Sequence, residues 1–158
     1  PAWAYSAAVI FVGTLVYANS LSGVFTFDDA VSVAENSSIR QLWPLSGPLS
    51  RPERGEPVAA RPVVNLSFAI NYALHGLDVR GYHVFNIGLH LVNGLLLFGL
   101  IRRTAHRDGV ACAVALIWMV HPLLTEAVNY VSQRTELLMA LFYLLTLYAS
   151  VRAAVVRL

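Results

Sequence analysis

The sequence predicts an all-α membrane protein, a polytopic bundle of about four transmembrane helices. Hydrophobic residues make up 57% of the 158-residue chain and charged residues 13%, about half of the charged share of a soluble domain. Residues 1–27 contain no Asp, Glu, Lys or Arg. The net charge is only +2 and the basic residues are not gathered on a polar domain, which argues against nucleic-acid binding.

Four apolar segments approach the roughly 20 residues that cross a bilayer. We expect the transmembrane helices at about residues 2–18, 82–101, 108–120 and 136–151. Trp3, Tyr5 and Tyr17 lie near the two ends of the first segment, as in an aromatic belt. A signal peptide is the alternative for this segment, but it lacks a basic start and its apolar run is long for a signal. We therefore treat residues 1–158 as a single N-terminal part of one transmembrane domain.

The arginines predict how the bundle is oriented. The short connection at 102–108, "RRTAHRD", carries three arginines, and Arg152 and Arg157 lie in the tail. Basic residues in short loops mark the cytoplasmic side. The loop at 19–80 also contains five arginines, but loops of about 60 residues hardly count in this rule. Counting crossings then places the loops at 19–80 and 121–135 on the same, non-cytoplasmic face.

The long first loop has a substructure of its own. Residues 41–60 are rich in proline and predict an irregular path. Pro62 suits the first position of a helix and Gly76 suits its end. Apolar residues recur between them at spacings of three and four, with polar residues on another side. This pattern predicts an amphipathic helix over 62–75 that lies along the membrane surface.

An acidic pair, Asp28 and Asp29, follows directly after the first apolar segment. One interpretation is a solvated turn at the membrane exit. The other is a site that uses negative charge, in which one carboxylate acts as a general base or binds a metal or another cation. A carboxylate beside a surface of low dielectric constant is well placed for such a role.

The loop at 121–135 holds a second group of polar residues. Glu126, Tyr130 and Arg134 follow at i, i+4 and i+8 and would share a face if the stretch is helical. They could form an ion-pair cluster that orients the loop, or a binding site, because Arg holds phosphate with two parallel hydrogen bonds. Metal binding by His121, Glu126 and an aspartate lacks the support of a known ligand spacing.

The second transmembrane segment carries a polar stripe. Its members are His83, Asn86, His90 and Asn93, at spacings of three, four and three. Polar side chains within a bilayer must face the bundle interior or a wet cavity. Hydrogen bonding between helices is the more common reason, and a substrate or proton path is the alternative.

Three stretches together resemble a known family. They are "FDD" at 27–29, the segment from "RPVVNLSF" to "LLLFGLI" at 61–101, and "HPLLTEAVNYVSQRTELL" at 121–138. In order and spacing they resemble the start of the TMTC-type (transmembrane and tetratricopeptide-repeat) O-mannosyltransferases, over about residues 25–148. These belong to the GT-C glycosyltransferases. The resemblance implies a GT-C-like N-terminal module of a membrane enzyme, which moves a sugar, mannose for this family, from a polyprenyl- or dolichyl-phosphate donor to a protein Ser or Thr hydroxyl.

The resemblance also implies roles for particular residues. Asp28 is expected to be the base and Asp29 its partner, although the order of the two is open. The expected substrate- and lipid-phosphate-binding residues are Arg134, Glu126, His121, Arg61 and Tyr130. No metal ligand is assigned, and a divalent metal cofactor is left open. The expected partners are the lipid-linked donor, an acceptor protein and the bilayer, without nucleic acid.

Two other classes of function compete with the transferase. One is a non-catalytic scaffold or assembly subunit that retains a GT-C-like bundle, and the other is a transporter that uses the polar stripe. The chain shows no tetratricopeptide pattern, so we expect a segment of a longer enzyme, incomplete as a catalyst on its own. All eleven basic residues are Arg, which favours a bacterial inner membrane, with the endoplasmic reticulum membrane as the alternative.

Overall fold

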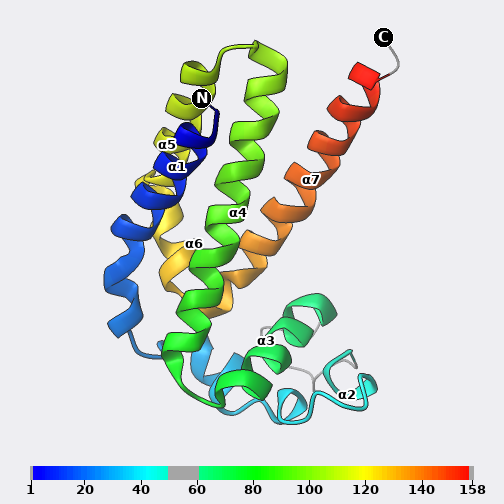
Figure 1. The fold of residues 1–158 in the computed structure, drawn as a ribbon. Helices are drawn as coiled ribbons and strands as arrows, with labels where there is room; N and C mark the ends of the chain where they lie inside the picture. The colour runs from blue at the N-terminus through cyan, green and yellow to red at the C-terminus, as the bar shows by residue number, and fades with distance from the viewer. Residues whose placement is uncertain (1, 50–60, 157–158) are drawn as a thin grey trace.

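The fold is known from a computed structural model that describes residues 2–49 and 61–156. Residues 50–60 of the proline-rich stretch at 41–60 lie outside the described residues. The described residues form helices and connecting turns without a β-strand. The α-helices are α1 (Ala2–Tyr17), α2 (Ser46–Leu49), α3 (Pro62–His75), α4 (Val79–Ala105), α5 (Asp108–Met119), α6 (Thr125–Asn129) and α7 (Arg134–Val156). This confirms the predicted all-α class (Figure 1).

Three helical stretches of the described chain are long and apolar enough to cross a membrane. They are Ala2–Ser22, Val79–Ala105 and Val131–Ala154. A fourth candidate is broken, because α5 and the turn-and-helix segment Pro122–Asn129 meet at an angle of 54°. Pro122 cannot donate the backbone hydrogen bond that would continue α5. The protein is therefore a multi-pass membrane protein, and its described residues contain three candidate spans, or four if the bent pair counts as one.

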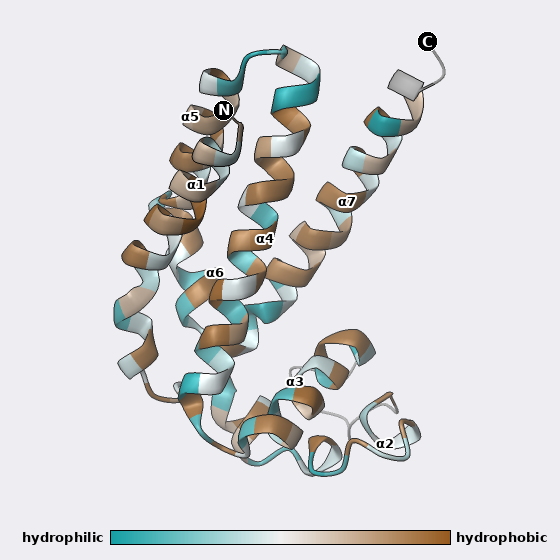
Figure 2. Ribbon diagram, viewed as in Figure 1, coloured by the Kyte–Doolittle hydropathy of each residue, from teal (hydrophilic) through white to brown (hydrophobic). Residues whose placement is uncertain are grey.

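Helix α4 is the centre of the bundle. It packs against α1 and α5 on one side and against α7 on the other (Figure 1). Asp78 caps its N-terminus by accepting the backbone N–H of Arg80 at 3.0 Å. Gly94 allows a close approach, since a Cβ there would overlap the Met119 side chain of α5, as small residues do between membrane helices. Figure 2 shows the largely apolar helices of this bundle.

The polar stripe of α4 faces the bundle interior, and all four of its side chains are buried. Asn86 donates to the carbonyl oxygens of Val128 and Tyr130, the His90 Nε2 pairs with the Met119 carbonyl, and Asn93 donates to the Leu137 carbonyl. The contacts are 2.9–3.5 Å long. The interpretation as bonding between helices is confirmed for these three residues. His83 differs, because neither of its ring nitrogens has a partner among the described residues.

Helix α3 carries both polar and apolar residues on its buried side. Ser67 and Asn71 are buried, and the Asn71 amide donates to the Gly81 carbonyl at 3.1 Å. Phe68 is buried as well. Apolar residues also lie on the exposed side, with Leu74 70% and Val63 49% exposed, and such exposed apolar residues suit contact with lipid. The location of α3 at the membrane surface remains a prediction.

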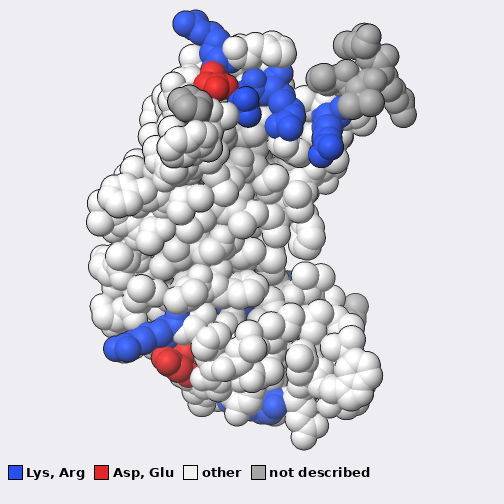
Figure 3. All heavy atoms as spheres, in the orientation of Figure 1, with Lys and Arg blue, Asp and Glu red and all other residues white. Residues whose placement is uncertain are grey.

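The charged side chains lie at the two ends of the molecule. Figure 3 shows a wide middle zone of this face without Lys, Arg, Asp or Glu. One end carries the α4–α5 connection, where Arg102 pairs with Asp108 at 2.8 Å. The long first loop and the third loop meet at the other end, as Figure 1 shows. The residues expected to carry chemistry therefore come together at one end of the bundle.

Candidate functional site

The two members of the acidic pair have opposite surroundings. Asp28 is exposed, whereas Asp29 has no exposed surface. The preceding residue, Phe27, has a φ of +45° and is 89% exposed, a left-handed conformation that is uncommon for a bulky residue. The turn therefore directs two neighbouring carboxylates in different ways, one outward and one into the protein.

The Asp29 carboxylate joins the first loop to the third. Its Oδ1 accepts the backbone N–H of Ser132 at 2.7 Å, and its Oδ2 accepts that of Thr26 at 3.2 Å. Each carboxylate oxygen thus has a backbone donor, which stabilises a buried charge. Asp29 holds the acidic turn against a segment more than 100 residues further along the chain.

Tyr130 provides a second connection. Its hydroxyl oxygen accepts the backbone N–H of Asp28 at 2.9 Å, and its ring meets that of Phe27 edge-on with centroids 6.4 Å apart. The backbone of Asp28 is therefore held by Tyr130 as well as by the hydrogen bonds of the neighbouring Asp29. Its side chain makes no hydrogen bond within the described chain, and so it can accept one from a substrate.

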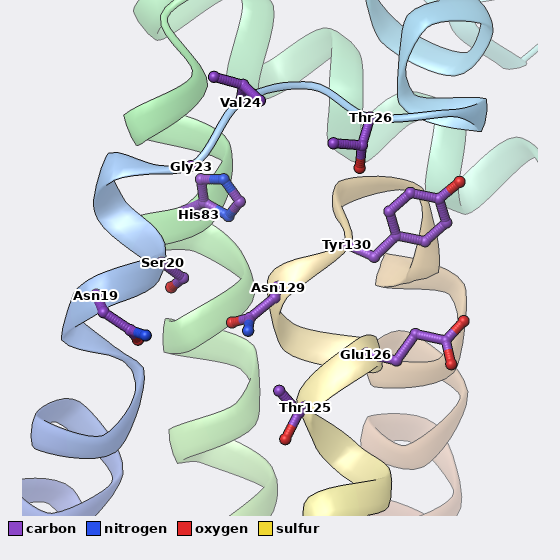
Figure 4. A pocket seen from close by; sticks show the side chains of 10 residues that line it. All are labelled: Asn19, Ser20, Gly23, Val24, Thr26, His83, Thr125, Glu126, Asn129 and Tyr130. Atoms are coloured by element: carbon purple, nitrogen blue, oxygen red, sulfur yellow. The ribbon is translucent and has the colours of Figure 1, made fainter.

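A cavity of about 570 Å³ lies beside this turn, within the size range of small-molecule sites. It opens between the end of the first span, the start of α4, and α6 (Figure 4). Its lining residues are Asn19, Ser20, Gly23, Val24, Thr26, His83, Thr125, Glu126, Asn129 and Tyr130. Glu126 is the only acidic or basic residue in that set, apart from the imidazole of His83.

Arg134 lies in the core and not at the cavity. It has no exposed surface. Its Nε donates to Asn86 at 2.8 Å, and its two terminal nitrogens donate to Ser67 and to the Tyr82 carbonyl at 3.2–3.3 Å. The guanidinium also stacks on the rings of Phe68 and Phe85, at 4.6 and 4.3 Å from their centroids. The expected contact with a lipid phosphate is therefore closed to it in this structure.

The third loop is not one continuous helix, so the condition under which Glu126, Tyr130 and Arg134 would share a face is not met. Helix α6 ends at Asn129, Tyr130 is extended, a 3₁₀ turn follows, and Arg134 begins α7. The extended residue breaks the helical period, so Glu126 lines the cavity while Arg134 turns into the core.

The other predicted residues divide between structural and accessible positions. The His121 Nδ1 accepts the N–H of Leu123 at 3.3 Å and so caps the short turn after α5, outside the cavity lining. Arg61, exposed at the start of α3, donates to the Thr135 hydroxyl at 3.2 Å. Among residues 2–49 and 61–156, no group of three His, Cys, Asp or Glu side chains could hold a metal ion.

Several cavity residues were not predicted. Asn19, Ser20, Thr125 and Asn129 belong to this group, and each is a neutral polar residue at or within three residues of the end of α1 or α6. Neutral polar residues are common at helix ends, so the sequence alone did not indicate that the end of the first span and α6 border the same cavity. Of the lining residues, His83 was noted beforehand as a member of the polar stripe, and Glu126 and Tyr130 as members of the expected binding set.

The fold and site define a class: a multi-pass helical membrane protein in which two loops at one end join an acidic turn to a cavity bordered by several hydrogen-bonding side chains. Relatives are consistent with this class. The chain is 34% identical over 154 residues to "Protein O-mannosyl-transferase F38B6.6" of Caenorhabditis elegans, covering 91% of this chain and 22% of the relative. It is 36% identical to "Protein O-mannosyl-transferase Tmtc1" of Drosophila melanogaster over 147 residues, covering 87% of this chain and 17% of that one. It is 31% identical to human "Protein O-mannosyl-transferase TMTC3", covering 86% and 16%.

The chain belongs to the TMTC-type family, and the resemblance drawn from its motifs is confirmed. It spans about a fifth of the length of the curated relatives it matches. No family model matches the chain. No solved structure matches it either. The expectation of a bacterial inner membrane gains no support, because these relatives are animal proteins.

Proposed function

We propose that the chain forms the acidic-loop part of a protein O-mannosyltransferase. In this proposal the enzyme takes mannose from a polyprenyl- or dolichyl-phosphate donor and transfers it to a Ser or Thr hydroxyl on the non-cytoplasmic side of the membrane. The names of the relatives support the reaction class. The observation that carries the proposal for this chain is the exposed Asp28 carboxylate, which has no partner among the described residues, on a turn that Asp29 and Tyr130 fix beside the cavity.

Asp28 is the general base in this mechanism. The acceptor hydroxyl oxygen forms a bond to the anomeric carbon of the sugar, and its proton passes to the Asp28 carboxylate. The bond between that carbon and the phosphate oxygen breaks, and the lipid phosphate leaves with the electron pair. A positioned base contributes about 10²–10⁴-fold to such a step. A carboxylate without a partner suits this role better than one whose two oxygens already accept backbone hydrogen bonds.

Asp29 is the positioning residue for that base. It does not contact the reacting atoms, and its two backbone hydrogen bonds hold the turn in place. Arg61 is the exposed arginine of the expected binding set, and in this proposal it meets the leaving phosphate, where a fixed cation stabilises developing negative charge. Arg134 instead fixes the polypeptide around α3, α4 and α7. Glu126 and Tyr130 contact the substrate from the cavity.

The test is sugar transfer by the full-length protein with Asp28→Asn. Glu35→Gln is the matched control, because Glu35 is another exposed carboxylate of the same loop that does not line the cavity. We expect Asp28→Asn to lower the transfer rate by about 10²–10⁴-fold and the control to leave it unchanged. A rate in Asp28→Asn equal to that of the wild type would reject Asp28 as the base. Absence of transfer from the wild-type protein itself would favour the non-catalytic scaffold.

A further inference from the structure

The cavity next to the acidic turn has an unusual lining for a site that would hold a lipid phosphate. No Arg or Lys contributes to it, and its one carboxylate, on Glu126, would repel an anion. Its other polar groups are hydroxyls, amides and an imidazole, which can donate or accept hydrogen bonds without a net charge. These groups match a neutral ligand that carries several hydroxyls.

His83 points into this region from the first turns of α4 (Figure 4). Its side chain is 1% exposed, yet neither Nδ1 nor Nε2 has a hydrogen-bond partner in the described chain. The other three members of the polar stripe, by contrast, bond to carbonyl oxygens of neighbouring helices. A buried polar group without a partner is costly. The imidazole is therefore the member of the stripe that lacks a structural explanation.

Asn129 supplies a second group of this kind from the opposite wall. Its Oδ1 is buried and has no hydrogen-bond partner among the residues that the structure describes, and Figure 4 shows the side chain reaching from α6 toward the end of the first span. An asparagine amide offers a donor and an acceptor side by side, the pair that two neighbouring hydroxyls of one ring can satisfy. Two unpartnered groups on different helices thus border one cavity.

We infer that this cavity binds a neutral, hydroxyl-bearing group, a sugar ring or the hydroxyl segment of an acceptor, through His83 and Asn129. The inference rests on the proposed function, because the cavity borders the turn that carries Asp28. Thr26 and Tyr130 belong to both, since they line the cavity and hydrogen-bond with the acidic pair. A group bound there lies beside the base, while the phosphate of a lipid-linked donor must lie outside the cavity, where cations are available.

The first experiment measures KM for donor and for acceptor peptide with Asn129→Ala in the full-length protein. The matched control is Asn71→Ala, which removes another buried amide whose carbonyl oxygen is unpartnered but which does not line the cavity. Loss of one hydrogen bond corresponds to about three- to tenfold in KM, with kcat nearly unchanged if the bond is the same in substrate and transition state. A higher KM for the donor assigns the cavity to its sugar, and a higher KM for the peptide assigns it to the acceptor.

A second experiment does not depend on catalysis. The chain has one cysteine, Cys112, which is buried, so Asn129→Cys introduces a single reactive thiol into this part of the protein. We expect methyl α-mannoside or a Ser/Thr peptide to slow its labelling by a maleimide, and inorganic phosphate to have no effect. Labelling that neither neutral probe slows, together with unchanged KM values in Asn129→Ala, would overturn the inference. Protection by phosphate alone would also overturn it, since the cavity would then be an anion site.

The two proposals can fail separately. If Asp28→Asn keeps full activity but the mannoside protects the introduced thiol, the base assignment fails and the cavity assignment stands. If Asp28→Asn abolishes transfer and no neutral probe protects the thiol, the cavity assignment fails and the base assignment stands.

Discussion

Replacing either aspartate of the acidic pair by asparagine makes the same chemical change at adjacent positions, but the structure predicts a loss of stability only for Asp29→Asn. Asp29 is fully buried, and its two oxygens accept the backbone N–H groups of Ser132 and Thr26 at 2.7 and 3.2 Å. In Asp29→Asn one oxygen becomes an NH₂ group that faces a backbone donor. The side chain of Asp28 is exposed and unpartnered in the described chain, so Asp28→Asn removes no internal bond.

The size of the Asp29 effect follows from these contacts. A buried donor left without its acceptor costs about 1–3 kcal/mol, and replacing a charged acceptor by a neutral one weakens a hydrogen bond by about 1 kcal/mol. Asp29→Asn loses one bond outright and weakens the other through loss of the charge. We therefore expect the free energy of unfolding to fall by about 2–4 kcal/mol, enough to lower the thermal midpoint by several degrees.

The assay compares the thermal midpoints of purified wild type, Asp28→Asn and Asp29→Asn in detergent, together with transfer activity at a temperature where all three are folded. Asp28→Asn should match the wild type in stability and lose activity. Asp29→Asn should lose stability and part of its activity, because the turn is no longer held. Equal stability of all three proteins would refute the assignment of Asp29 as the connection between the loops.

Three further substitutions test the surroundings of the site. Arg134→Lys keeps the charge but not the planar fork, so we expect a loss of at least about 2 kcal/mol of stability, measured by thermal unfolding; a stable variant would contradict its structural role. Tyr130→Phe removes the hydroxyl that accepts a backbone hydrogen bond from the acidic turn, and transfer should fall about three- to tenfold at nearly constant stability, whereas an unchanged rate would show that this bond does not position the base. Gly23→Ala would place a Cβ 2.8 Å from the His83 Nε2 and should raise the KM of whichever substrate occupies the cavity. Gly88→Ala, where a Cβ meets nothing within 4 Å, is its control, and equal KM values for the two variants would argue against contact with His83.

The fold class was predictable because it depends on the length, hydropathy and charge of each segment, which can be read from a single sequence. Long apolar segments with few charges predict membrane helices directly, and the structure describes three such spans and a bent fourth. The bend was harder to foresee. The angle between α5 and the segment after it depends on how both pack against α4.

The site was predictable in part, for a physical reason. Asp28, Asp29, Glu126 and Tyr130 do gather at one end, as the crossing count implied. The count says which end a residue occupies and nothing about burial, and so it could not separate the exposed Asp28 from the buried Asp29. The burial of Arg134 was not predictable for a different reason. A charged side chain is usually exposed, but here aromatic rings and a carbonyl oxygen of α3 and α4 enclose the guanidinium.

For the proposed reaction, the shortness of α5 bears on how a lipid-linked donor would approach the site. Its 12 residues rise about 18 Å, whereas the hydrocarbon layer is about 30 Å thick. If its Asp108 end lies at one headgroup region, its other end stops well inside the bilayer. Non-helical backbone at that depth is tolerated where it lines a wet cavity, and Glu126 and Asn129, which follow α5 in the chain, do line a cavity. A polyprenyl chain could then deliver its headgroup sideways from the membrane, with its tail remaining among the lipids.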